Sequence, residues 1–237
     1  MKVAIMQPYF CPYLGYFKLI NSVDKFVLYD NIQFTKTGWI NRNRILVNGE
    51  PHRFTIPIKK NSSLIDIRDR ELAEESLREI DAILKVISNT YHRAPNFGKV
   101  FPLIKGLFLH SEKNLFLFIH HTITELCRYM DIKTEVIISS SLKIDHSLSS
   151  SHKVLAICKH LNAKTYLNLP NGKHLYQLDK FKEEGIDLAF QSNDYLMYRQ
   201  FSKEFVPCLS IIDTMMFCDI RKIKDYLISV NPEDEKQ

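Results

Sequence analysis

The chain has 237 residues, of which 45% are hydrophobic and 25% charged, the composition of a globular protein with a sizeable core. No apolar run reaches the roughly 18 residues that a membrane helix needs, and the N-terminus has no signal-peptide pattern, so we expect a cytoplasmic protein without membrane insertion. The net charge of +5 is spread along the chain and forms no basic stripe, so we expect no nucleic-acid partner.

The first thirty residues predict a strand–loop–helix–strand unit. Lys2–Met6 is a short apolar run typical of a buried strand. Tyr13–Val23 carries apolar residues at helical spacing, and Pro12 suits the first helical position. Lys25–Asp30 is a second apolar run. This order is typical of a βαβ unit.

A hairpin and a helical block are predicted next. Asn-Gly at positions 48 and 49 is the strongest short hairpin signal, and it separates the arms Arg44–Val47 and Arg53–Ile58. Helical periodicity then covers Ile65–His92 and Phe97–Met130, with a break near Ser111.

Strands and helices alternate in the remaining chain, which predicts a mainly parallel sheet. We predict an α/β fold in a single domain over residues 1–237: a Rossmann-like, mainly parallel sheet with an N-terminal β-hairpin and a helical insertion at about residues 65–132. The predicted later elements are the strands Thr134–Ile138, Thr165–Leu169 and Leu188–Gln191 and the helices Ser149–Leu161, Leu175–Glu184 and about Asp219–Val230.

The first loop is the predicted ligand site, because ligands of parallel sheets bind at the carboxyl ends of the strands and helix N-termini favour anions. A glycine on the first helical turn allows close approach to the backbone, and tyrosines can stack on a base or sugar while donating a hydrogen bond. The competing interpretation is an aromatic face packed in the core. The residues predicted here are Gln7, Tyr9, Tyr13 and Gly15.

Further candidates follow the second strand. Asp30 at the strand end suits a sugar hydroxyl, an amine or a metal, or it simply caps a loop. Arginines near an aromatic residue and two amides suit a phosphate clamp, or they are solvated charges on a hairpin arm. His92 at a helix end is the histidine we select as general base, with a plain surface histidine as the alternative. The other predicted substrate-binding residues are Gln33, Lys36, Trp39, Asn41, Arg42, Arg44 and Asn168.

Metal and cofactor motifs are absent from the sequence. The five cysteines are scattered without a Cys-x-x-Cys pair, and the adjacent His120 and His121 do not face each other on a helix, so we predict no metal site. No P-loop, G-x-G-x-x-G or HExxH motif occurs. Asp213 lies in an apolar run and needs a partner if it is buried, although a helix cap is the simpler interpretation.

Segments along nearly the whole chain carry a family resemblance. They include Lys2–Phe10, Pro12–Phe17, Gly38–Ile45, Phe54–Pro57 and Leu209–Asp213. These segments resemble those of the WbqC-like family, whose members are encoded among O-antigen and other polysaccharide genes. The resemblance is most specific in the N-terminal part. It implies an enzyme of bacterial surface-polysaccharide biosynthesis that acts on nucleotide-linked sugars.

A second similarity concerns the loop after the first strand. The pattern from Gln7 to Gly15 and Ile20 is similar to the His-x-Gly-His loop of nucleotidyltransferases and pantothenate-synthetase-type ligases, which bind ATP phosphates at this helix. Tyr13 and Tyr16 stand where that pattern has histidines.

Three functional hypotheses result. The first is transfer of an acyl or aminoacyl group to the amine of a dTDP- or UDP-linked amino sugar. The second is a nucleotidyltransferase or ATP-dependent ligase, with ATP as the cofactor. The third is a non-catalytic nucleotide-sugar-binding or scaffold protein, and a homodimer is left open in each case. Under the first, Arg42 and Arg44 hold the pyrophosphate, Tyr9 and Tyr13 contact sugar or base, and Asp30 or His92 removes the amine proton.

Overall fold

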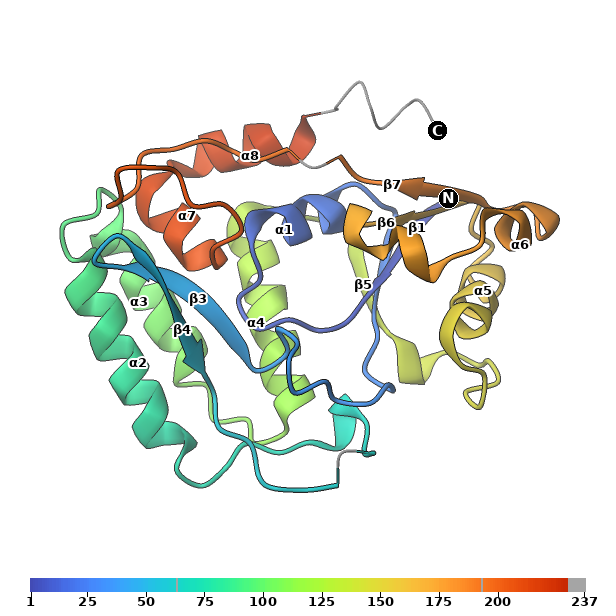
Figure 1. Ribbon diagram of the computed structural model, residues 1–237, viewed down its shortest axis with the longest axis horizontal. Coiled ribbons are helices and arrows are strands. Elements are labelled where there is room, and N and C mark those ends of the chain that lie inside the picture. Colours follow the sequence, from blue (N-terminus) through green and yellow to red (C-terminus); the bar gives the residue numbers. More distant parts are fainter. Residues whose placement is uncertain (63, 193, 230–237) are drawn as a thin grey trace.

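A five-stranded parallel sheet is the centre of the fold in the computed structural model, which describes residues 1–62, 64–192 and 194–229 (Figure 1). The strand order is β5-β2-β1-β6-β7, and every neighbouring pair is parallel. Numbered within the sheet, this is the 3-2-1-4-5 part of the Rossmann order. The predicted α/β, Rossmann-like class is therefore confirmed. The strands are β1 (Lys2–Met6), β2 (Lys25–Leu28), β5 (Glu135–Ile138), β6 (Thr165–Asn168) and β7 (Asp187–Phe190).

Two hydrophobic cores cover the two faces of this sheet. Ala4 and Phe26 belong to one core, which also includes residues of α1, α4 and α8. Val3 and Val27 belong to the other, with residues of α5 and α6. Successive side chains of a strand point to opposite faces, so burial on both sides requires the continuous apolar runs seen in β1 and β2. The helices are α1 (Leu14–Asn21), α2 (Ser76–Tyr91), α3 (Phe97–Phe108), α4 (Leu115–Met130), α5 (Ser150–His160), α6 (Leu178–Glu183), α7 (Ile211–Phe217) and α8 (Ile220–Ile228).

The predicted hairpin and helical segment lie in the long connection between β2 and β5. The hairpin pairs β3 (Arg42–Val47) with β4 (Glu50–Thr55) in antiparallel register. Asn48 and Gly49 at its turn have φ values of 52° and 82°, the positive values that a two-residue turn of this kind requires. Figure 1 shows the hairpin, α2 and α3 at one end of the molecule and α5 and α6 at the other.

The predicted helix over Ile65–His92 is wrong in its first part. Only a 3₁₀ turn at Ile67–Asp69 forms before α2 begins at Ser76. The amides of this turn bond outside it: the Ile67 N–H donates to the Ile32 carbonyl at 2.9 Å, and the Arg68 N–H donates to the Asp30 carbonyl at 3.1 Å. The segment therefore docks against the loop after β2, which a helical periodicity could not reveal.

Three smaller differences concern helix limits. Helix α1 begins at Leu14, after Pro12 rather than with it, and α6 begins at Leu178 rather than Leu175. Helix α7 was not predicted, because almost all of its side chains are buried and it shows no polar face. Every helix within the described ranges is too short or too polar to span a bilayer.

Candidate functional site

A cavity of about 650 Å³ opens at the carboxyl ends of the central strands. Met6 and Gln7 come from the end of β1, Tyr29 follows β2, and Asn168 ends β6. Ser151, in the first turn of α5, closes one side. Strands β2 and β6 flank β1 on opposite sides, so the cavity lies at the switch point where Rossmann-like sheets bind ligands.

Aromatic rings and uncharged polar groups make up most of the cavity wall. No Asp, Glu, Lys or Arg occurs among its described lining residues. Aromatic faces pack against sugars and bases, and a few amides and hydroxyls fix the orientation of a bound ligand. The aromatic residues are Tyr9, Tyr13, Tyr29, Trp39 and Tyr176, and the polar ones are Gln7, Ser151, Asn168, Asn171 and His174.

The tyrosines of the cavity are protonated near neutral pH, and burial raises the pKa of their hydroxyls further. Desolvation raises the pKa of Tyr29 to about 12, and it is also the largest cause of the raised pKa of Tyr9, Tyr13 and Tyr176. These phenols therefore serve as hydrogen-bond donors near neutral pH rather than as bases. His174 is the one imidazole in the described lining, and imidazole is the usual general base in enzymes.

The loop after β1 is held in place by side chains that donate hydrogen bonds to its backbone carbonyls. The Tyr16 hydroxyl donates to the Gln7 carbonyl at 2.8 Å, and Asn43 Nδ2 donates to two carbonyls further along the loop at 2.8 and 2.7 Å. The Tyr13 ring lies across the start of α1. A Cβ atom at Gly15 would come within 2.5 Å of Tyr13 Cε2. Glycine at this position thus permits the tyrosine to form part of the cavity wall.

Asn168 supports the opposite wall. Its Nδ2 donates to the hydroxyls of Tyr166 at 2.9 Å and Tyr176 at 3.1 Å, and its Oδ1 accepts from the Leu169 N–H at 2.7 Å. A Cβ atom at Gly172 would lie only 3.0 Å from Asn168 Nδ2. Asn168, which was predicted to bind substrate, lines the cavity, and its amide also holds the Tyr176 ring and the following segment against the cavity.

Asp30 does not line the cavity, although β2 ends beside it. Its carboxylate is 1% exposed and accepts from the Ser140 N–H at 2.9 Å and the Ser140 hydroxyl at 2.6 Å. It therefore joins the end of β2 to the end of β5. Gln33 and Lys36 are exposed in the loop that follows, and Gln33 forms a bridge with Asp66.

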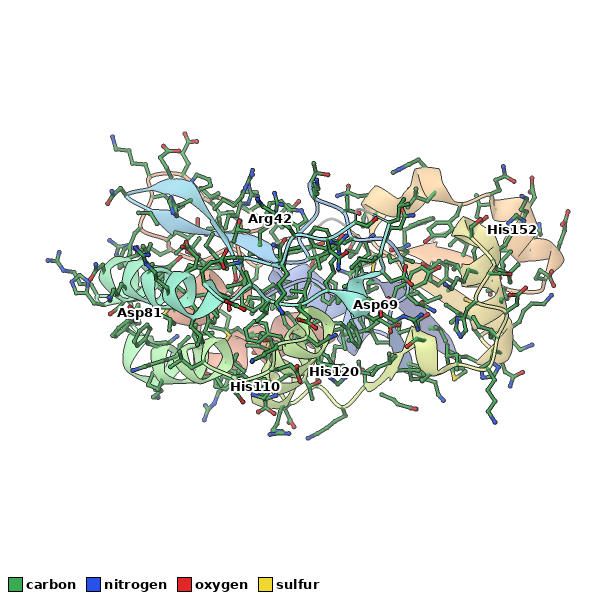
Figure 2. The ribbon with its side chains drawn as sticks, turned by 90° about the horizontal axis from the view of Figure 1, so that it is seen from below. Arg42, Asp69, Asp81, His110, His120 and His152 are labelled. Carbon is green, nitrogen blue, oxygen red and sulfur yellow. The ribbon has the colours of Figure 1, made fainter. Side chains whose placement is uncertain are left out.

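Neither of the two predicted phosphate-binding arginines lines the cavity, and only Arg44 contacts one of its wall residues. Arg44 Nη2 donates to the Pro207 carbonyl at 3.1 Å, and its guanidinium carbon lies 5.9 Å from the centre of the Trp39 ring. Arg42 donates to the Lys36 carbonyl, and Figure 2 places it on the hairpin side of the molecule.

Two further predicted residues have structural contacts elsewhere. The Asn41 side chain is buried and donates to the Ile56 carbonyl at 2.8 Å, next to the hairpin. His92 is exposed at the end of α2, where its Nδ1 lies 2.8 Å from the Asn89 carbonyl oxygen. The structure does not bring His92 to the cavity, since α2 and α5 lie at opposite ends of the molecule (Figure 1).

His120 and His121, the pair predicted not to bind metal, lie on α4, and His110 lies between α3 and α4. The rings of His110 and His121 stack with centres 3.8 Å apart, and Figure 2 shows His110 and His120 on the side of α3 and α4. No group of three or more His, Cys, Asp or Glu side chains suited to a metal ion occurs in the parts of the chain that the structure describes.

Sequence reasoning placed Asn168, Asn171 and Gly172 after β6 on the ligand side of the sheet, but it did not identify His174 as a cavity residue. A 3₁₀ segment, Pro170–Leu175, folds over the cavity and supplies Asn171 and His174. Asn171 was recognised as lying on the ligand side of the sheet but also fits a simple turn. No sequence pattern marked His174 as a site residue, since it lay in the short link before the helix predicted to begin at Leu175.

Comparison with known proteins identifies the family of this chain. Residues 7–225 match the WbqC-like protein family. The chain belongs to the WbqC-like protein family. This confirms the resemblance seen in the sequence, and the match includes every residue of the cavity wall from Gln7 onward.

One relative of this WbqC-like protein covers almost the full length. The uncharacterized protein Rv1507c of Mycobacterium tuberculosis is 27% identical over 228 residues, which are 95% of this chain and 97% of the relative. A comparison with solved structures gave no match.

Proposed function

We propose that this WbqC-like protein is an enzyme of bacterial surface-polysaccharide biosynthesis that transfers an acyl or aminoacyl group to the amine of a nucleotide-linked amino sugar. The observation that carries the proposal is the cavity of about 650 Å³ at the switch point of the sheet. Its size is in the usual range for small-molecule sites, and its aromatic, uncharged wall suits a sugar and a base.

The substrate is oriented by groups on two sides of the cavity. Tyr9 and Trp39 provide ring faces for the base or sugar, and the amides of Gln7 and Asn171 match sugar hydroxyls. The first turn of α5, which contributes Ser151, favours the diphosphate because a helix N-terminus carries a partial positive charge.

The reaction needs a base for the amine and a donor for the developing oxyanion. The sugar nitrogen attacks the acyl carbonyl, a carbon–nitrogen bond forms, and the bond to the donor's leaving group breaks. His174 takes the proton from the nitrogen and passes it to the leaving group. The Tyr13 hydroxyl, a protonated phenol near neutral pH, donates to the carbonyl oxygen. His174 thereby takes the role first given to Asp30 or His92, which lie away from the described cavity wall.

The test combines turnover with binding. Purified protein is incubated with dTDP- and UDP-amino sugars, a panel of acyl thioesters and aminoacyl donors, and ATP, and products are followed by mass. His174→Gln keeps polar contacts but removes the base, so transfer should fall by about 10²- to 10⁴-fold. Nucleotide-sugar affinity by calorimetry should change by no more than about threefold.

His152→Gln is the matched control, since His152 is an exposed histidine of α5 that does not line the cavity (Figure 2). It should leave both measurements unchanged. Absence of turnover together with absence of nucleotide-sugar binding refutes the proposal. Release of pyrophosphate from ATP favours the ligase hypothesis instead, and tight binding without turnover favours a binding protein.

A further inference from the structure

A second groove, of about 730 Å³, shares no lining residue with the cavity. Four of its lining residues are basic, and none of those described is Asp or Glu. None of the four pairs with a carboxylate in the described ranges. The basic groove, as we name it, is lined by Arg93, Arg199, Lys203 and Lys222, with Tyr198, Gln200, Phe201 and Phe217 among its other residues.

A buried carboxylate fixes the loop that carries two of these basic residues. Gln200 is 6% exposed, and its Nε2 donates to Asp213 Oδ1 at 3.0 Å while its Oε1 accepts from the Val206 N–H at 2.8 Å. The Tyr198 hydroxyl donates to the same Asp213 oxygen at 2.8 Å. The loop is thus tied to the first turn of α7, and its basic side chains project from a fixed backbone.

Aromatic packing joins the other walls of the basic groove. The Phe201 ring meets the Phe217 ring edge-on with centres 4.8 Å apart, yet Phe201 remains 42% exposed. A Cβ atom at Gly49, in the hairpin turn, would lie 3.6 Å from the Phe201 carbonyl oxygen. Lys222 Nζ donates to the Met197 carbonyl at 3.1 Å, which joins α8 to the same loop.

We propose that the basic groove binds a phosphate-bearing anion with at least two negative charges. The four cations of the groove, which have no carboxylate partner among the described residues, repel one another, and a bound anion would neutralise them. Arginine guanidinium groups match phosphate oxygens in bidentate geometry. A concave groove of this volume encloses a diphosphate or a lipid headgroup, whereas an acidic protein surface would need a broader face. This binding is independent of the reaction proposed for the cavity.

The test uses sodium pyrophosphate in calorimetry and vesicles in co-sedimentation, both at low ionic strength. The vesicles contain phosphatidylcholine alone or with phosphatidylglycerol. We expect binding to at least one phosphate probe and none to phosphatidylcholine alone. The double variant Arg199→Glu/Lys203→Glu should weaken that binding at least tenfold. His174→Gln in the cavity should leave probe binding unchanged, because the cavity and the basic groove share no lining residue.

The control is Lys105→Glu/Lys164→Glu, which makes the same change in net charge at exposed residues outside the basic groove. Its affinity for the phosphate probe should lie within about twofold of that of the unaltered protein. Melting curves should show that both double variants are folded. If the protein binds the phosphatidylglycerol vesicles but not pyrophosphate, the ligand is a lipid headgroup. If pyrophosphate displaces the protein from these vesicles, the groove recognises the phosphate group that both probes share. The proposal is overturned if neither phosphate probe binds or if both double variants bind the probe alike.

Discussion

At the scale of single residues, the Tyr13–Gly15 contact makes the sharpest prediction. Gly15→Ala places a Cβ atom where the Tyr13 ring now lies, so the ring must leave its place in the cavity wall. Nucleotide-sugar affinity should fall about tenfold. Stability should change little, because alanine favours a helix over glycine by roughly 0.5–1 kcal/mol and the displaced Tyr13 ring loses packing that offsets this gain.

Gly106→Ala separates the two effects of the Gly15 substitution. Gly106 lies within α3, and a Cβ atom there would have no neighbour within 4 Å. It should therefore share any gain in helix stability and leave ligand affinity unchanged. Calorimetry and urea denaturation on both variants measure the two quantities. Equal affinities for the two variants would show that the Tyr13 ring has no part in binding.

The sequence located the side of the cavity after β1 and β2 well and the side after β6 in part, because Asn168 was predicted there and His174 was not. Gln7, Tyr9, Tyr13 and Trp39 were predicted from the loops after the first two strands, and all four line the cavity. Their position follows from chain order, because β1 and β2 are adjacent parallel strands. His174 depends on the fold of the segment after β6, which no local pattern specifies.

At the scale of elements, the buried carboxylate of α7 links distant parts of the chain. Asp213 accepts hydrogen bonds from Tyr91 of α2 at 2.7 Å and from Tyr198 and Gln200. Asp213→Ala leaves these donors unpaired in the core, so the free energy of unfolding should fall by about 2–4 kcal/mol. Urea denaturation measures this loss, and the exposed Asp225→Ala of α8 should change it by less than about 0.5 kcal/mol.

The same carboxylate predicts a pH dependence of stability. Burial raises the pKa of Asp213, although its hydrogen bonds from Tyr91, Tyr198 and Gln200 lower it in part. The folded state therefore binds the Asp213 proton more tightly than the unfolded state does, so protonation of Asp213 adds to the free energy of unfolding at low pH. This gain is lost as pH rises from about 4 through the raised pKa.

Asp213→Asn removes that titration and so provides the comparison. The unfolding free energy of the unaltered protein, minus that of Asp213→Asn, should be larger at pH 4.5 than at pH 7.5. Urea denaturation at both pH values measures the difference. A difference that grows with pH would mean that the hydrogen bonds outweigh burial.

Helix α7 is an element that sequence patterns could not predict. Its run of buried side chains has no polar face, so it resembles a strand as much as a helix. The partners of Asp213 come from positions 13 to 122 residues away in sequence. Local periodicity cannot specify such contacts. The helix and its carboxylate network become visible only in the folded chain.

At the scale of the whole molecule, the strand order determines where the cavity forms. Alternating strands and helices predicted a parallel sheet, but the order β5-β2-β1-β6-β7 depends on the chain returning across β1 after β5. That return creates the switch point and brings β6 and the following segment opposite the first loop. The long connection between β2 and β5, which holds the hairpin, the 3₁₀ turn and α2, α3 and α4, obscured this order in the sequence.

A single tryptophan reports directly on the central claim that the cavity binds a nucleotide-linked sugar. Trp39, the only tryptophan of the chain, is 37% exposed in the cavity wall. Titration with a dTDP- or UDP-amino sugar should change its fluorescence saturably, with one site per chain. The curve for Gly15→Ala should shift to about tenfold higher ligand concentration. An unchanged fluorescence signal, together with no heat of binding in calorimetry, would contradict the account.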